Sequence, residues 1–139
     1  MASEEKLQSD IVRKFSELYP LKRGQLFHVP NERITASQKL KAKSIGVFSG
    51  VSDLIYIGDL IVKCLELKAP NSYHKVSHVR QQVEWGKTME SIGNYWKIIT
   101  SEKDAISFIN GNYNDGLSVE QVEKMLNEAE SKGKKTIRF

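Results

Sequence analysis

Residues 50–68, GVSDLIYIGDLIVKCLELK, place charged side chains inside a run that otherwise has the composition of buried β-strands. β-Branched and aliphatic residues lie on both sides of Gly58-Asp59, a dipeptide typical of a hairpin turn. Asp59 is accounted for by that turn, whereas Asp53, Glu66 and Lys68 interrupt the apolar pattern. Because charged side chains are rarely buried without a partner or a function, these three residues need an explanation.

A two-residue turn at Gly58-Asp59 predicts that Asp53 lies opposite Cys64, with Glu66 as its diagonal neighbour about 7–8 Å away at Cα. Side chains alternate between faces, so Glu66 and Lys68 share the face of Asp53. Two carboxylates so placed repel each other unless a cation lies between them, and oxygen ligands favour Mg²⁺ or Mn²⁺. Lys68 is then placed to orient a water molecule or to stabilise a phosphate. The alternative is an ion pair that ends the sheet, and a longer turn would shift the register.

The composition is that of one globular domain, residues 1–139, with 40% hydrophobic and 27% charged residues. No apolar run approaches the roughly 20 residues of a membrane span, and the polar, acidic start is unlike a secretory signal. The single cysteine, Cys64, rules out an internal disulfide framework. We therefore expect an intracellular, cytoplasmic protein that does not enter a membrane.

Hydrophobic periodicity predicts a mixed α/β fold in which helices cover a sheet. Ser3 and the two glutamates after it are typical of a helix start, and Ser118 with Gln121 is typical of another. We expect helices over about 3–19, 76–92, 101–110 and 118–133, a short basic helix within 35–45, and strands over 26–29, 53–57, 60–68 and 95–100.

The order and identity of these segments resemble a known family. Asp53, followed 13 residues later by Glu66-Leu67-Lys68, resembles the signature of the PD-(D/E)xK nuclease superfamily. The chain is more closely similar to the VRR-NUC group of small phage and bacterial nucleases, which are related to Holliday junction resolvases. The resemblance covers about residues 3–110 and includes the segments 4–8, 27–31, 46–55 and 66–70 and a later helix with Gln82 and Trp85. Ser52 departs from the proline that the family has before its first aspartate.

The resemblance implies a restriction-endonuclease-like core. Outside the span of the resemblance, the amphipathic segment at about 117–139 is expected to be a helical extension that either forms a dimer or packs on its own domain. The resemblance implies that Asp53, Glu66 and the Leu67 backbone carbonyl hold Mg²⁺ or Mn²⁺ and that Lys68 positions the attacking water. A glutamate of the first helix completes the acidic cluster, either Glu4, which fits the family spacing better, or Glu5. A glutamine of the later helix approaches the site, either Gln82, which matches the family, or Gln81.

Basic residues flank the hairpin and give the chain a net charge of +4, which favours a polyanionic partner. The candidate DNA contacts are Asn31, Arg33, Lys39, Lys41, Lys43, His74 and Lys75, each of which is alternatively a solvated surface residue. The resemblance implies the function of a metal-dependent endonuclease acting on branched or Holliday junction DNA as a homodimer. The alternatives are a non-catalytic DNA-binding or assembly protein on the same fold, and a nuclease for linear or nicked DNA or for RNA.

Overall fold

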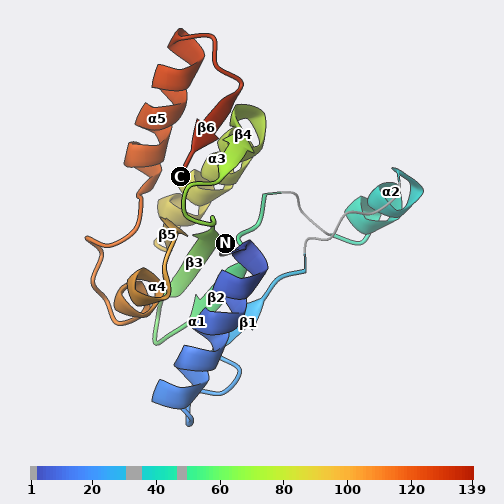
Figure 1. Ribbon diagram of the computed structural model, residues 1–139. Helices are drawn as coiled ribbons and strands as arrows, with labels where there is room; N and C mark the ends of the chain where they lie inside the picture. The colour runs from blue at the N-terminus through green and yellow to red at the C-terminus, as the bar shows by residue number, and fades with distance from the viewer. Residues whose placement is uncertain (1–2, 31–35, 47–49) are drawn as a thin grey trace.

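A four-stranded mixed sheet of order β1-β2-β3-β5 lies at the centre of the structure, a computed structural model that describes residues 3–30, 36–46 and 50–139 (Figure 1). The strands are β1 (Leu26–His28), β2 (Leu54–Ile57), β3 (Val62–Leu67) and β5 (Tyr95–Ile99). The two pairings made by β2 are antiparallel, whereas β3 and β5 are parallel and are joined by a helical crossover. This arrangement is the expected mixed α/β fold.

Helices cover both faces of the sheet. The helices α1 (Glu4–Leu18) and α4 (Glu102–Ile109) pack on one face, and α3 (Val76–Ser91) and α5 (Val119–Ser131) pack on the other (Figure 1). The strand β3 is buried on both faces, as expected for a strand with a parallel neighbour between two helical layers. The polar side chains of β3 therefore lie in the protein interior.

The predicted helix starts are confirmed by side-chain caps. The Ser3 side chain accepts a hydrogen bond from the Lys6 N–H at the start of α1, and Ser118 and Gln121 form a reciprocal capping box at the start of α5. The apolar residues of α1 recur along one face, which buries Leu7, Ile11 and Phe15. Because the cap fixes where α1 begins, it also fixes where the glutamates of its first turn lie.

The predicted register of the hairpin is wrong by two residues. Ile57 pairs with Val62 instead of Leu60, because the turn is longer than the Gly58-Asp59 dipeptide suggested. The Gly58 N–H donates to the Ile61 carbonyl at 3.0 Å, and Leu60 adopts a positive φ of 66°. A shift of two keeps every side chain on its predicted face, because strand side chains alternate with a period of two.

Two short strands lie outside the sheet and were not expected from the sequence. The strands β4 (Tyr73–Lys75) and β6 (Thr136–Arg138) pair antiparallel, beside α3 and α5 (Figure 1). The segment 117–139 therefore packs on the rest of its own chain through α5 and β6, which was one of the two expected roles. The basic segment forms α2 (Ala36–Ser44), which lies away from both helical layers (Figure 1). Among the described residues, no helix combines the length and the apolar character that crossing a membrane requires.

The hairpin carries a further charge, Lys63, whose role is structural. Its ammonium is buried and donates to the carbonyls of Phe108 and Ile109 at 3.0 and 2.7 Å. A cation at this position suits the carbonyl end of α4, where the Phe108 carbonyl also accepts from the Gly111 N–H and the Ile109 carbonyl accepts from Lys63. Lys63 therefore joins the middle of the sheet to α4 and lies at the opposite end of β3 from Lys68.

Candidate active site

The candidate site lies where β2 begins and β3 ends. One step beyond the observed pairing of Leu54 with Leu65 places Asp53 level with Glu66, instead of opposite Cys64 as predicted. Directly opposed residues of an antiparallel pair have their side chains closer together than diagonal ones. The true register therefore brings the two carboxylates nearer to each other than the sequence suggested.

Asp53 is fixed by hydrogen bonds on both sides. Its Oδ2 accepts from the Leu67 N–H at 2.8 Å, and its carbonyl accepts from the Val29 N–H at 2.9 Å. The His28 Nδ1 lies 2.9 Å from the same carbonyl and must carry a proton there, because a carbonyl only accepts. The N–H and C=O groups of one strand residue point to the same side, so the Leu67 carbonyl also faces the Asp53 side of β3.

Glu66 is almost fully buried, and only one of its two oxygens has a hydrogen-bond partner. Its Oε1 accepts from the Gln82 side-chain amide at 2.8 Å and lies 3.7 Å from the Lys68 ammonium, which is also buried. Its Oε2 is buried and has no partner. Burial, followed by the charge of Asp53, raises the pKa of Glu66 well above its usual value, and the charge of Lys68 opposes this shift.

Glu4 reaches the same region from the first turn of α1. Its Oε1 is buried without a hydrogen-bond partner, although the rest of the side chain is half-exposed. Burial raises the pKa of Glu4, the charge of Lys68 lowers it, and that of Asp53 raises it. Glu5, the alternative, is exposed, and so is Gln81, the alternative to Gln82. The structure therefore brings together Asp53, Glu66, Lys68, Glu4 and Gln82.

His74 is a neighbour of this cluster that the sequence placed only among possible DNA contacts. Its Nε2 lies 3.5 Å from the Glu4 Oε1 and 2.7 Å from the Ser72 hydroxyl. That hydroxyl donates its single proton to the Ala69 carbonyl, so Nε2 carries the proton shared with Ser72. Burial and the charges of Lys68 and His78 lower the pKa of His74 to about 4, so its contact with Glu4 at neutral pH is not an ion pair. The pairing of the three-residue strand β4 creates this position, and the sequence carries no local signal for it.

The unpartnered oxygens suit a hard cation. Two buried carboxylate oxygens, one each from Glu66 and Glu4, have no hydrogen-bond partner, and oxygen is the ligand that Mg²⁺ and Mn²⁺ prefer. Within residues 3–30, 36–46 and 50–139, no three His, Cys, Asp or Glu side chains are close enough to form a metal site by themselves. A metal here would therefore need the Leu67 carbonyl and water molecules in addition to the carboxylates.

Comparison with known proteins identifies the fold. No protein-family model matches the sequence, and no curated protein matches it either. A solved structure described as a "VRR_NUC domain protein" superposes on this chain with a TM-score of 0.63, covering 84% of this chain and 93% of the other. This chain has the fold of a VRR_NUC domain protein. The sequence identity is 20%, so the likeness concerns the fold, and the resemblance inferred from the residues is confirmed at that level.

On this VRR_NUC fold, the candidate DNA contacts lie in different places. Asn31 and Arg33 fall outside the described residues, as does the side chain of Lys39. Lys41 and Lys43 are exposed on α2. His74 belongs to the acidic cluster, and Lys75 is exposed beside it on β4.

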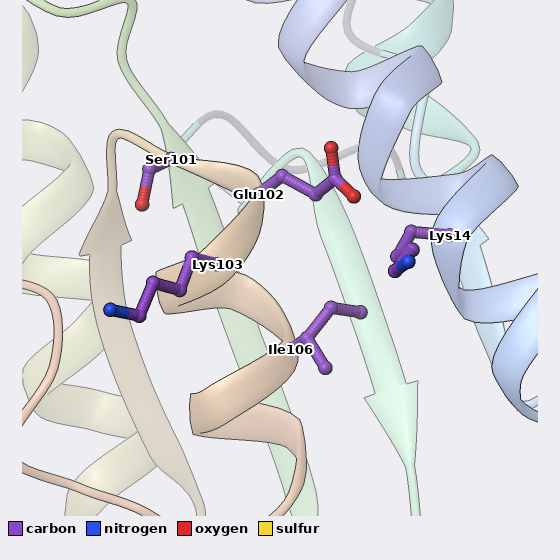
Figure 2. A pocket seen from close by; sticks show the side chains of 5 residues that line it. All are labelled: Lys14, Ser101, Glu102, Lys103 and Ile106. Atoms are coloured by element: carbon purple, nitrogen blue, oxygen red, sulfur yellow. The ribbon is translucent and has the colours of Figure 1, made fainter.

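A surface pocket of about 530 Å³ lies between α1 and α4 (Figure 2), and none of the cluster residues lines it. Its lining residues are Lys14, Ser101, Glu102, Lys103 and Ile106. Lys14 is ten residues from Glu4, which corresponds to about 15 Å along α1. The pocket contains none of the carboxylates described above and is not the candidate active site.

Proposed function

We propose that this chain is a VRR-NUC nuclease that hydrolyses DNA phosphodiester bonds with the help of Mg²⁺ or Mn²⁺. The observation that supports the proposal is the convergence of Asp53, Glu66 and Lys68 at one end of the sheet, with a buried Glu66 oxygen left unpartnered. A protein rarely keeps an unsatisfied buried carboxylate oxygen unless a ligand satisfies it. The fold shared with a VRR_NUC domain protein adds support.

In the proposed mechanism, Asp53, Glu66 and the Leu67 carbonyl would hold the metal together with water molecules, and Glu4 would complete the acidic cluster beside it. When bound, Mg²⁺ polarises the phosphate and lowers the pKa of an adjacent water. Lys68, 3.7 Å from the Glu66 Oε1, donates a hydrogen bond that orients the attacking water. Attack at phosphorus breaks the bond to the 3′ oxygen, which leaves a 5′-phosphate and a 3′-hydroxyl.

Gln82 acts on the geometry of the site in this proposal. Its amide donates to the Glu66 Oε1 at 2.8 Å, which would leave the Oε2 free to bind the metal. Asp53 is oriented by the Leu67 N–H in the same way. Because both carboxylates are fixed before substrate binds, little reorganisation is needed during the reaction.

The proposed substrate is branched DNA, with the four-way junction as its symmetric example, and the proposed active form is a homodimer. A symmetric junction needs two paired cuts, and a two-fold dimer presents two identical sites. This part of the proposal rests on analogy with the family and not on residues of this chain.

A second candidate function is DNA binding without catalysis. One observation favours it: the described residues contain no group of three His, Cys, Asp or Glu side chains that could hold a metal. On this interpretation, Lys68 and Glu66 end the sheet as an ion pair, and Asp53 only caps the Leu67 N–H.

Cleavage of a labelled four-way junction tests the proposal, with linear, nicked and single-stranded DNA as comparison substrates. Each is incubated with Mg²⁺, Mn²⁺, Ca²⁺ or EDTA, using wild type, Asp53→Ala, Glu66→Gln and the matched control Glu5→Gln. We expect metal-dependent cutting that falls at least 100-fold in the two site variants and persists in the control. Calorimetric Mn²⁺ titration of the same proteins provides a second readout. Junction binding with no cleavage of any substrate would replace the nuclease proposal with the second candidate function.

A further inference from the structure

The ribbon formed by β4 and β6 has two chemically different faces. Tyr73 pairs with Arg138, and Lys75 pairs with Thr136, so these four side chains lie on one face. All four are exposed, and Tyr73 is 67% exposed. The opposite face carries Ile137, which is buried in the core with α3 and α5.

The exposed face is cationic. Lys134 and Lys135 lead into β6 and are also exposed. The segments 69–75 and 133–139 contain no aspartate or glutamate. The ribbon therefore gathers the positive charges of Lys75, Lys134, Lys135 and Arg138 with no acidic residue in its own strands or their flanks.

The position of Arg138 is fixed. Its guanidinium donates to the Asn71 side-chain oxygen at 2.9 Å and lies over the Tyr73 ring at 5.7 Å from the centroid. Asn71 adopts a positive φ of 62°, and its N–H donates to the Phe139 carbonyl at 2.6 Å. A guanidinium so fixed loses less entropy when it binds a phosphate than a mobile one does.

The inner face of the ribbon borders the candidate active site. His74 pairs with Ile137 on that face, and its Nε2 lies 3.5 Å from the Glu4 Oε1. The cationic residues thus lie on the opposite face of the same ribbon whose inner face contacts the acidic cluster. Two carboxylates of that cluster repel a phosphate, so a neighbouring cationic surface is where a DNA backbone gains its attraction.

We propose that the exposed face of the β4–β6 ribbon binds the DNA phosphate backbone next to the scissile bond. This inference rests on the proposed function for its choice of DNA as the polyanion. The surface contacts phosphates through cations without reading base edges, so it binds independently of sequence. This surface is separate from the basic helix α2. The inference gives β6 a role in binding the substrate.

Fluorescence anisotropy of a labelled linear duplex and a labelled four-way junction, in EDTA and over a series of NaCl concentrations, tests the inference. The test variant is Lys75→Gln/Lys134→Gln/Lys135→Gln. We expect the dissociation constant to rise at least 10-fold. We also expect the plot of log affinity against log salt to become less steep by about 2–3 units of slope, because each lost phosphate contact reduces the steepness by about 0.9. The corresponding triple Lys→Arg variant should bind like wild type.

The matched control is Lys14→Gln/Lys103→Gln/Lys124→Gln, which removes the same charge from α1, α4 and α5. Unchanged affinity in the ribbon variant, or an equal loss in the control, would overturn the inference. All six positions are surface lysines, and thermal unfolding of each variant checks that the fold is kept. The outcomes also separate this inference from the proposed function. If the ribbon variant still cleaves DNA and binds it with unchanged affinity, only the proposed binding surface is overturned. If binding depends on the ribbon but no DNA is cleaved, only the proposed nuclease function is overturned.

Discussion

Replacement of Gly86 by alanine should destabilise the protein, although alanine is the better helix former. Gly86 is buried in the interior of α3. A Cβ atom there would lie 2.7, 2.8 and 3.0 Å from the Cδ2, Cγ and Cε2 atoms of Trp96. Trp96 lies in β5 and is 1% exposed, so its ring has little room to move.

Two opposing terms set the magnitude. Alanine gains about 1 kcal/mol of helix propensity over glycine. Overpacking of a rigid core costs about 1–3 kcal/mol, and distances this short favour the upper half of that range. The net loss in the free energy of unfolding is about 1–2 kcal/mol, which corresponds to a fall in Tm of about 3–7 °C for a chain of this size.

The same substitution should affect the candidate site. Gln82 precedes Gly86 by four residues and therefore lies on the same face of α3. Displacement of the helix from Trp96 lengthens the 2.8 Å hydrogen bond from Gln82 to Glu66. We expect lower cleavage per folded molecule, even at temperatures where the variant is fully folded.

Urea denaturation in EDTA measures the stability change, with Thr88→Ala as the control. Thr88 is an exposed residue of the same helix, so its replacement should stabilise the protein by about 0.5 kcal/mol. The double variant Gly86→Ala/Trp96→Phe should cost less than the sum of the two single changes. A Gly86→Ala protein more stable than wild type, with an unchanged m-value, would refute the packing argument.

Three further predictions concern the hairpin and the ribbon. Gly50→Ala should lower the free energy of unfolding by about 1–2 kcal/mol, because Gly50 has φ +88° and an added Cβ would lie 3.1 Å from the Gln81 carbonyl. Since this contact lies beside the site, cleavage per folded molecule should also fall. Urea denaturation and cleavage assays measure the two effects. Lys63→Met should lower the free energy of unfolding by about 1–3 kcal/mol, because it leaves the Ile109 carbonyl at the end of α4 without its partner, and cleavage per folded molecule should be unchanged. The pKa of His74 is lowered from 6.5 to about 4 in the folded protein. As the pH falls from 6.5 towards 4, the unfolded chain takes up a proton at His74 that the folded protein does not, so the free energy of unfolding decreases over this range. His74→Gln should remove that component from the pH dependence of unfolding measured in EDTA, and an unchanged pH profile would contradict the assigned burial.

The faces of the hairpin could be predicted from the sequence, but its register could not. Alternation placed Asp53, Glu66 and Lys68 on one face, and that result held because the true turn is longer than the predicted one by an even number of residues. The pairing depends on the turn, and Leu60 occupies a positive φ that leucine rarely adopts. The Gly58-Asp59 signal therefore predicted the hairpin correctly and its turn wrongly.

The site beyond the hairpin depended on tertiary contacts. The choices of Glu4 over Glu5 and of Gln82 over Gln81 came from the family resemblance, and the structure places the chosen residues toward the cluster. Their roles in catalysis remain predictions. His74 was missed as a member of the cluster because its position depends on β6, more than 60 residues further along the chain.

That separation has a consequence for synthesis of the protein. The pairing of β4 with β6 joins Tyr73 to Arg138, whereas the hairpin pairs residues only a few positions apart. Domains begin to form during translation, but a contact cannot form before both partners have left the ribosome. The sheet and its carboxylates are complete in the chain well before β6 emerges. On the proposed function, the carboxylates of the site are therefore synthesised before the ribbon that is proposed to hold DNA beside them, and that surface forms only when residues 136–138 are free to pair with β4.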